Sequence, residues 1–441
     1  MPTHAELLTR HRRVLPSWLA LYYQEPIALV GGEGCRVRDA EGRQYLDFFA
    51  GILTTVSGYK VPQIVEALQR QAERMLHTST LYLIEPQIEL AERIAYLSPI
   101  PEAKVFFTNS GTEANDTALM LATAFRRSNQ ILALRNSYHG RSFSAVSITG
   151  NRSWSPSSLS PLQVTYVHNG YRYRSPFGHL ADDQFITACV EDLRHMLDVA
   201  TSGDVAAMIA EPIQGVGGFV TPPDGFFRAM KEVLDESGIL FISDEVQTGW
   251  GRTGEHFWGI EAHGVVPDIM TFAKGVGNGL SIGGVVARTE IMDCLQANSI
   301  STFGGNPLAM AGALANLEFI LEHDLQTSAL KVGSHLKARL DHLRDEFQII
   351  GDVRGKGLMI GVELVHPGGK DPNPEAAALV MEEAKVGGLL IGKGGLHGNC
   401  LRIAPPLVLS EEEADEGFEI LRTAVERAES RPAGPGGIKA D

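Results

Sequence analysis

The chain has 441 residues, of which 44% are hydrophobic and 21% charged, and its formal net charge is −15. This length exceeds what one small core needs, so we expect two domains or one large and one small lobe, and the composition excludes global disorder. The acidic balance argues against a nucleic acid or an anionic membrane surface as the main partner, although a local pocket can still bind small anions.

Four cysteines are scattered along the chain without a Cys-x-x-Cys pair. This pattern is typical of a reducing compartment and lacks the usual cysteine-based zinc frameworks, so we expect free thiols, no metal site and a cytoplasmic location. No stretch approaches the roughly eighteen consecutive apolar residues that a membrane-spanning helix needs, and no membrane partner is expected.

In chain order, the first segment predicts strands and then a helix. The stretch CRVRDAEGRQYLDF (35–48) has the pattern of two strands joined by a turn at Glu41-Gly42. Residues 61–77 then carry apolar side chains at helical spacing, from Ile64 to Met75. We assign residues 1–65 to a segment that contributes to a small domain.

Between residues 66 and 320 the pattern is that of a large domain. Short apolar runs alternate with helical segments, and the runs are KVFFT, QILAL, AAMIA, ILFIS and DIMTF. Near-continuous apolar runs separated by helices are typical of a parallel sheet covered on both faces.

Residues 321–430 predict a second, smaller lobe. FQIIGDVRGKGLMIGVEL and NCLRIAPPLVL supply strands, and a helix follows in which Ser410 and Glu413 have capping-box spacing. The last residues, 431–441, are rich in proline and glycine, and we expect them to be disordered.

Polar or aromatic residues follow each of the five apolar runs. KVFFT leads into NSGTE, QILAL into RNSYHGR, AAMIA into Glu211, ILFIS into Asp244-Glu245, and DIMTF into Ala273-Lys274. In open α/β sheets the ligand crevice lies outside the carboxyl ends of the strands. The sequence therefore predicts one site to which five strands contribute.

The segment after KVFFT predicts a helix whose start can bind an anion. Ser110 and Glu113 have capping-box spacing, and Gly111 lets backbone N–H groups approach a ligand such as a phosphate. Taken alone, the segment is equally compatible with an ordinary capped helix. The chain has neither the G-x-x-x-x-G-K-[ST] loop of nucleoside-triphosphate sites nor the G-x-G-x-x-G fingerprint of dinucleotide sites. We therefore expect neither a nucleoside triphosphate nor a dinucleotide as the ligand.

Asp244 and Lys274 each end a buried run, and each needs a partner. Desolvation lowers the pKa of a lysine and makes its amine nucleophilic, which suits an aldehyde. Pyridoxal phosphate supplies an aldehyde for Lys274, a phosphate for the helix start and a protonated ring nitrogen for Asp244. Tyr138 offers a face on which the ring can stack. These residues predict pyridoxal 5′-phosphate as the cofactor.

Seven motifs in order resemble the class III aminotransferases, which are pyridoxal-phosphate enzymes of fold type I. They are FTNSGTEAND, NSYHGR, AEPIQG, SDEVQTGWGRTG, FAKGVGNG, STFGGNP and LRIAPPL. YQEP, GRQYLDFFAGI and LYLIEPQIELAERI are most similar to alanine–glyoxylate aminotransferase 2-like proteins, with 4-aminobutyrate and ornithine aminotransferases next. The resemblance implies a large domain with a mostly parallel seven-stranded sheet, and a smaller α+β domain from the N- and C-terminal segments.

The resemblance also implies roles for individual residues. Lys274 matches the Schiff-base lysine that shuttles the substrate proton, and Asp244 matches the partner of the pyridine nitrogen. Thr302 matches a phosphate ligand from the neighbouring subunit, which implies a homodimer, or a dimer of dimers, with its active site at the interface. The other implied cofactor contacts are Ser110, Gly111, Thr112, Tyr138, His139, Glu211, Val246 and Gln247.

Four residues are candidates for substrate binding. Arg402 matches an arginine that clamps a substrate carboxylate, and Glu211 matches an acid that pairs with it when the substrate has no charge there. Arg141 matches an arginine for a distal carboxylate but is equally compatible with a surface position. Ile52 fits a pocket wall or the core equally well. Residues 169–178 either line the entrance or form an ordinary loop.

The implied function is transfer of an amino group from an amino acid or omega-amino acid to a 2-oxo acid (pyruvate, glyoxylate or 2-oxoglutarate) by a ping-pong mechanism. The alternatives are a 4-aminobutyrate or ornithine-type omega-transaminase, or an aminomutase or decarboxylase of the same family. A non-catalytic binding protein has no need of Lys274, and the missing fingerprint disfavours a nicotinamide dehydrogenase. Many relatives read Gly-His-x-His-Pro where this chain has GYKVP (58–62), so the preferred acceptor stays open.

Overall fold

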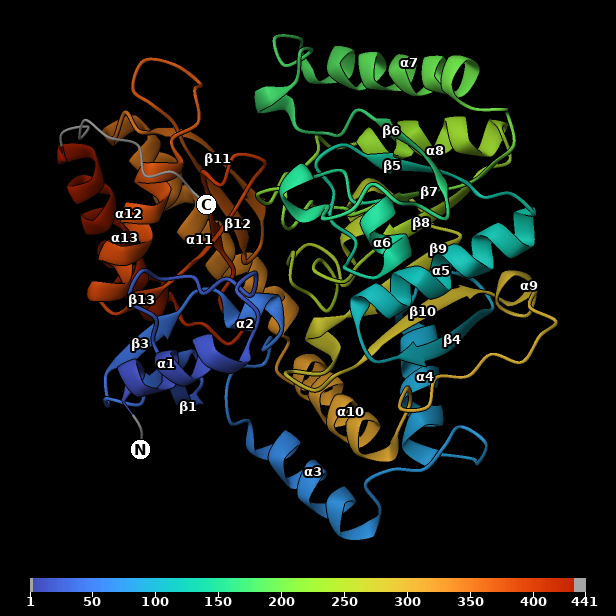
Figure 1. Ribbon diagram of the computed structural model, residues 1–441, viewed down its shortest axis with the longest axis horizontal. Coiled ribbons are helices and arrows are strands. Elements are labelled where there is room, and N and C mark those ends of the chain that lie inside the picture. The colour runs from blue at the N-terminus through green and yellow to red at the C-terminus, as the bar shows by residue number, and fades with distance from the viewer. Residues whose placement is uncertain (1–2, 432–441) are drawn as a thin grey trace.

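The computed structural model describes residues 3–431, and its central feature is a seven-stranded sheet of order β4-β10-β9-β8-β7-β5-β6 (Figure 1). β10 runs antiparallel to both neighbours, and the other strand pairs are parallel. The strands are β4 (Ala103–Thr108), β5 (Gln130–Leu134), β6 (Gln163–Val167), β7 (Val205–Ala210), β8 (Leu240–Asp244), β9 (Ile269–Ala273) and β10 (Gly283–Arg288). All five predicted runs are strands of this sheet, and β6 and β10 are additional.

Helices cover both faces of this sheet, because its strands are apolar on both sides. In β5, Ile131 and Ala133 pack in a cluster with α5, whereas Leu132 and Leu134 pack in a cluster with α7 and α8. Side chains alternate between the two faces of a strand, so a run without polar residues is buried on both. The helices of this part are α4 (Glu85–Leu97), α5 (Gly111–Arg126), α6 (Phe143–Ser147), α7 (Asp182–Ala200), α8 (Phe226–Glu236) and α9 (Thr289–Met292).

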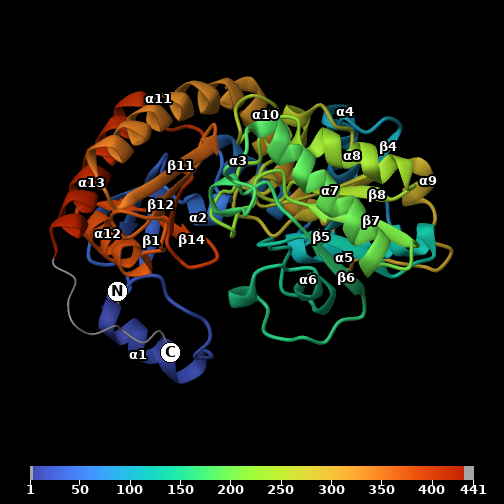
Figure 2. The same cartoon turned by 90° about the horizontal axis from the view of Figure 1, so that it is seen from above.

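A second part contains two four-stranded sheets, of order β1-β2-β3-β13 and β11-β12-β15-β14, with the long helices α11 and α13 on its outer side (Figure 2). Its strands are β1 (Leu29–Glu33), β2 (Arg36–Asp39), β3 (Gln44–Asp47), β11 (Ile350–Lys356), β12 (Met359–Leu364), β13 (Leu389–Leu390), β14 (Gly392–Gly394) and β15 (Cys400–Ile403). Its helices are α1 (His4–Val14), α2 (Ala50–Leu53), α11 (Leu325–Glu346), α12 (Pro374–Val386) and α13 (Glu411–Ser430).

Both ends of the chain build this second part. β3 pairs in parallel with β13, so that Leu46 lies opposite Leu389. The smaller α+β part made from N- and C-terminal segments is therefore confirmed. The domain boundaries expected at 65 and 320 fall inside α3 (Pro62–Arg74) and α10 (Pro307–Glu322), which pack on each other, and they stay predictions. Except for Arg431, the tail expected to be disordered lies outside the described residues.

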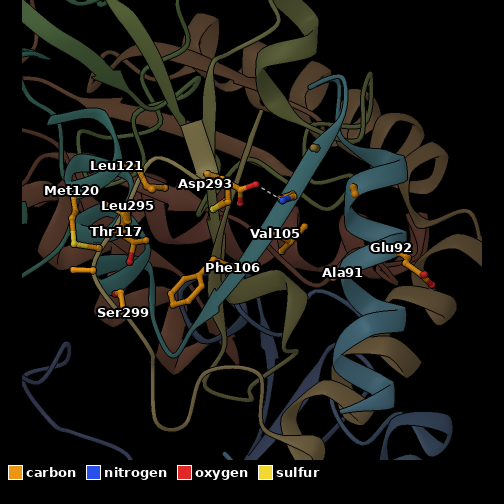
Figure 3. A pocket seen from close by; sticks show the side chains of 15 residues that line it. Ala91, Glu92, Val105, Phe106, Thr117, Met120, Leu121, Asp293, Leu295 and Ser299 are labelled. Carbon is orange, nitrogen blue, oxygen red and sulfur yellow. Dashed lines mark hydrogen bonds and ion pairs between the residues drawn. The ribbon is translucent and has the colours of Figure 1, made fainter. Parts of the chain in front are cut away.

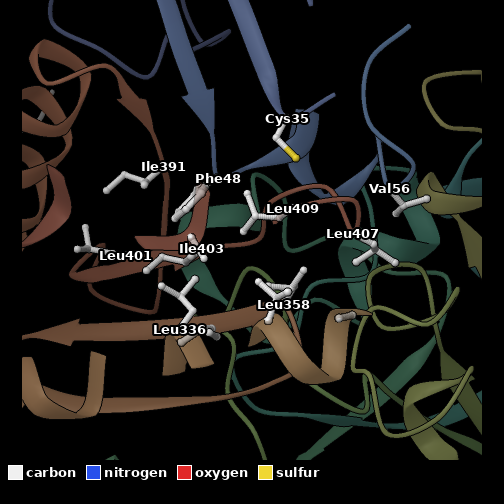
Figure 4. Packing of buried hydrophobic residues seen from close by; sticks show 14 of the residues in the cluster. Cys35, Phe48, Val56, Leu336, Leu358, Ile391, Leu401, Ile403, Leu407 and Leu409 are labelled. Atoms are coloured by element: carbon white, nitrogen blue, oxygen red, sulfur yellow. The ribbon is translucent and has the colours of Figure 1, made fainter. Parts of the chain in front are cut away.

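A large hydrophobic cluster contains residues from both parts of the molecule (Figure 4). Its packing determines the directions in which Phe48 and Arg402 point. Leu401 and Ile403 of β15 point into this cluster, as does Phe48. Because side chains alternate along a strand, Arg402 points to the opposite face of β15.

Within the described part of the chain, no helix has the length and apolar character needed to cross a bilayer. All four cysteines are free thiols, as expected.

Candidate active site

A cavity of about 220 Å³ lies where the carboxyl ends of several strands meet. It gathers residues that follow β5, β7, β8 and β9 and the start of α5, which is the convergence that the strand ends predict. Ten of the predicted site residues line it: Gly111, Thr112, Tyr138, His139, Arg141, Glu211, Asp244, Val246, Gln247 and Lys274.

A larger hollow of about 620 Å³ lies elsewhere, between α4, β4 and α5 (Figure 3). Most of its lining is apolar, and its Lys104 and Asp293 already pair with each other. The smaller cavity instead combines a lysine, two buried carboxylates and a histidine. We therefore take the smaller cavity as the candidate active site, since perturbed titratable groups gathered in a cleft mark functional sites.

Asp244, at the end of β8, is held by a buried network. Its Oδ2 accepts a hydrogen bond from Asn115 Nδ2 at 2.8 Å and lies 2.7 Å from His139 Nδ1. Thr271 Oγ1 donates to Asn115 Oδ1 at 2.7 Å, which orients the amide. Sequence reasoning missed Asn115, although a detectable signal was present: an amide on the buried face of α5, one turn after Gly111.

Lys274 lies directly after β9, in left-handed backbone geometry with φ of 49°. Its pKa is lowered from 10.5 to about 8, mainly because burial disfavours the ammonium and also because Arg402 is cationic. Asp244 and Glu211 act in the opposite direction. The arrangement gives an amine that is much more often neutral at physiological pH than a surface lysine.

The start of α5 is shaped for close approach of a ligand. Ser110 is its N-cap and accepts from the Glu113 N–H at 3.4 Å. A Cβ at Gly111 would lie only 2.9 Å from Val246 Cγ1, so no larger residue fits without a shift. Thr112 Oγ1 accepts the backbone N–H groups of Arg141 and Ser142 at 3.2 and 3.0 Å, which ties the next loop to the helix start.

The expected pairing of Glu211 with Arg402 is absent. Glu211 accepts backbone N–H groups from Tyr138 at 2.9 Å and Gly215 at 2.8 Å, so both of its oxygens already have donors. Arg402 donates from Nη2 to Gln247 Oε1 at 2.9 Å instead. Burial raises the pKa of Glu211 to about 7, with Asp244 adding to the effect, so this carboxyl titrates near neutrality.

Glu245, the neighbour of Asp244, has a structural partner of its own. Its two oxygens accept the N–H groups of Gly259 and Ile260, each at 2.8 Å, at the start of a short 3₁₀ helix (Gly259–His263). Burial raises the pKa of Glu245 to about 7. Of the two adjacent carboxylates, only Asp244 therefore serves the cavity.

Two of the lining residues, Tyr138 and Arg141, also contact aromatic rings, whereas Ile52 and Thr302 do not line the cavity. Tyr138 contacts Trp154 edge-on, with ring centroids 5.4 Å apart. Arg141 is exposed and lies over the Trp18 ring at 5.5 Å. Ile52 is 45% exposed, so it is not a core residue, and it does not line the cavity. Thr302 is exposed on the surface of this chain.

Residues 169–178 form a tether between the two parts of the molecule. Tyr171 donates its hydroxyl to Glu363 of β12, and Arg174 Nε donates to the same carboxylate at 2.6 Å. Arg354 of β11 completes the network from Nη2 at 2.8 Å. Neither Tyr171 nor Arg174 lines the candidate cavity.

Comparison with known proteins identifies the family. The family model described as aminotransferase class-III matches residues 21–425. The mitochondrial alanine–glyoxylate aminotransferase 2 homolog 2 of Arabidopsis thaliana is 40% identical over 94% of this chain and 86% of its own. A leucine/methionine racemase of Thermococcus litoralis is 40% identical over 98% of each chain. A solved (S)-enantioselective omega-transaminase from Thermomicrobium roseum has a TM-score of 0.90 and 35% identity, over 97% of this chain and 99% of its own. The chain therefore belongs to the class III aminotransferases, enzymes of fold type I that depend on pyridoxal phosphate.

Proposed function

We propose that this enzyme transfers an amino group from an amino acid or omega-amino acid to a 2-oxo acid by a ping-pong mechanism, with Lys274 and Asp244 as its catalytic residues. The observation that carries the proposal is that the amine of Lys274 and the carboxylate of Asp244 face one cavity. A lysine with a lowered pKa and a fixed carboxylate are the two groups that this cofactor requires from a protein.

The residues of the cavity fit pyridoxal phosphate. Gly111 has no room for a Cβ, and α5 directs its first N–H groups and the positive end of its dipole toward the cavity, which suits a phosphate. Ser110 and Thr112 belong to the same turn, and Tyr138 and Val246 would lie against the ring. The buried Asp244 carboxylate suits a protonated ring nitrogen.

The protein residues have distinct tasks in the mechanism. When bound, the cofactor supplies an electron sink for the carbanion that forms at the substrate's α-carbon. Lys274 would hold the cofactor's aldehyde carbon and then, released by the incoming amine, carry the proton from one carbon to the other. His139 and Asn115 hold the Asp244 carboxylate in one orientation, since each shares a hydrogen bond with its Oδ2.

We further propose that Arg402 binds the substrate carboxylate. Its guanidinium is buried and forms no ion pair within residues 3–431, so an anionic substrate would provide the missing charge. Arg141, which lines the cavity and is exposed, would bind a second, distal carboxylate. Ile52 is exposed outside this cavity, and we propose that it borders the path by which a substrate enters. Because Glu211 is fully hydrogen-bonded, it acts as a support for the Tyr138 loop.

A homodimer is the proposed assembly, with Thr302 completing the phosphate site of the partner. Segment 75–83 exposes several large apolar side chains, and Leu83 is 93% exposed. The His77 and Phe303 rings lie 5.1 Å apart, so residues 300–303 continue this surface. Contiguous exposed apolar residues of this size mark protein interfaces. We propose a cytoplasmic location from the four free cysteines.

Activity measured in dimers that combine two different inactive chains tests this assembly. Dimers made by co-expressing Lys274→Ala and Thr302→Ala chains should recover part of the wild-type activity, because one of the two sites would then be intact. Each variant alone should be much less active. Monomers in light scattering, or mixed dimers no more active than the parents, would contradict the shared site.

The donor and acceptor are best identified by a panel. Relatives are named for alanine, glyoxylate and acetylornithine. We propose testing alanine, β-alanine, β-aminoisobutyrate, 4-aminobutyrate and ornithine against pyruvate, glyoxylate and 2-oxoglutarate. A ping-pong enzyme loses its visible cofactor band when a donor is added alone, regains it with the 2-oxo acid, and gives parallel double-reciprocal plots. No loss of the band with any amine would overturn the proposed function.

Racemisation is the second candidate, because two relatives are named as racemases. Both reactions begin with removal of the same α-proton, so the residues of the cavity do not separate them. A racemase interconverts L- and D-alanine without any 2-oxo acid and keeps its cofactor band. Chiral chromatography after incubation with L-alanine alone distinguishes the two, and it also detects a decarboxylase or aminomutase through its product.

A further inference from the structure

The guanidinium of Arg402 lies between two phenyl rings. Its Cζ is 5.1 Å from the ring centroid of Phe49 and 4.7 Å from that of Phe219, within the range of cation–π attraction. Its only hydrogen bond within residues 3–431 goes to the neutral amide of Gln247, and its Nε is buried without a partner. Two aromatic faces and one amide therefore hold this buried cation.

Strained backbone holds both rings. Phe219 has φ of +52°, and Phe49 begins a left-handed turn in which residues 50–53 have φ values of 48°, 59°, 67° and 58°. Each non-glycine residue in this conformation costs about 1 kcal/mol or more, so the surrounding contacts must enforce it. Strain of this kind collects where a side chain has to be held in one place.

Buried polar anchors lie next to each strained position. Asp47 Oδ1 accepts the N–H of Phe49 at 2.8 Å and the next N–H of the turn at 3.1 Å. The carbonyl of Gly218, immediately before Phe219, accepts from Arg354 Nε at 3.0 Å and Nη2 at 2.7 Å. The network that tethers the two parts of the molecule therefore also fixes the ring on one side of Arg402.

We propose that Phe49 and Phe219 are positioning residues that keep the Arg402 guanidinium in one orientation in both half-reactions, so that the enzyme accepts only amines that carry a carboxylate. This inference rests on the proposed transaminase function and adds a specificity rule to it. Turning the guanidinium away would break two cation–π contacts, while a substrate without a carboxylate would leave the buried cation unpaired.

The test compares L-alanine with isopropylamine, in which a methyl group replaces the carboxylate. Loss of the visible cofactor band gives the rate of the first half-reaction for each amine, without any acceptor. Wild-type holoenzyme should prefer alanine strongly. In Phe49→Leu and Phe219→Leu the KM for alanine should rise about tenfold with little change in kcat, and the preference should fall by a similar factor.

Phe48→Leu is the matched control, because Phe48 is fully buried and points into the hydrophobic cluster instead. It should lower the thermal stability and leave the preference unchanged. Phe219→Tyr keeps an aromatic face and should restore the wild-type ratio if Phe219→Leu loses it or fails to fold.

The outcomes separate the two proposals. Absence of any amine-dependent change in the wild-type band would overturn the proposed function itself. A wild type that uses isopropylamine as well as alanine would overturn only the specificity rule. Leucine variants at 49 and 219 that retain both the wild-type KM and the preference would refute the role of the two rings.

Discussion

The amine of Lys274 should titrate near pH 8 in the apoenzyme, far below an exposed lysine. Burial lowers its pKa from 10.5 to about 8, and the Arg402 cation contributes in the same direction. At pH 7 the neutral fraction is then about 9%, compared with about 0.03% for an unperturbed lysine. The site therefore holds roughly 300 times more of the nucleophilic form than a surface lysine does.

Competitive acetylation measures this directly. Apoenzyme is labelled with trace acetic anhydride between about pH 6 and about pH 11, and peptides are quantified by mass spectrometry. The labelling rate of Lys274 should rise with pH, reach half of its maximum near pH 8 and level off about one pH unit higher. Lys331 is the internal control, because its surface pair with Glu411 raises its pKa. A Lys274 profile that still rises at pH 10 would refute the proposed environment.

Two variants check the physical causes through opposite signs. Arg402→Met removes a cation that disfavours the ammonium, so the inflection for Lys274 should move to higher pH. Asp244→Asn removes a carboxylate that favours the ammonium, so the inflection should move lower. Shifts in the same direction in both variants would show that these charges do not control the amine.

Two further changes probe the cavity and the tether. Gly111→Ala places a methyl group 2.9 Å from Val246, and the resulting overpacking costs about 1–3 kcal/mol. This cost should weaken cofactor binding about tenfold or more, as measured by a fluorescence titration. Glu363→Gln removes the buried carboxylate that Arg354 shares with Arg174, while Asp352 still pairs with Arg354, and the free energy of unfolding should fall by about 1.5–3 kcal/mol in urea.

Each of these changes has a matched control in the same chain. In Gly31→Ala the nearest atom to the new Cβ is 3.9 Å away, so this variant should leave the cofactor affinity unchanged. Glu383→Gln breaks a surface pair with Arg427 and should cost less than about 1 kcal/mol. Equal effects in a variant and its control would contradict the packing or burial argument concerned.

Much of the large sheet could be predicted because its strands are apolar on both faces. Apolar residues dominate β5, β7, β8 and β9, and only Gln130, Ser243 and Thr271 are polar before the last residues of these strands. Such near-continuous apolar runs are typical of strands buried on both faces. β6 was missed because polar residues interrupt its apolar side chains, and β10 because it begins with two glycines. The sequence of β6 or β10 alone therefore does not predict a buried strand, and each is recognised only by its pairing with the adjacent strands of the sheet.

The parts of the site that sequence reasoning missed depend on contacts distant in sequence. Asn115 is oriented by Thr271, 156 positions away, and no local pattern reveals that pairing. The Glu211–Arg402 pair, expected when a substrate has no charge there, is not formed in this structure, because the loop after β7 folds back and supplies a backbone donor to Glu211. A loop's own N–H groups compete for a carboxylate, and only the folded backbone shows which partner prevails.

Borohydride reduction of the holoenzyme, followed by peptide mass mapping, tests the central claim most directly. It fixes the cofactor to the amine that holds it. The account predicts a single pyridoxyl-phosphate adduct on the peptide that contains Lys274, and none in Lys274→Ala. An adduct on another lysine, or a Lys274→Ala enzyme with full transaminase activity, would contradict it.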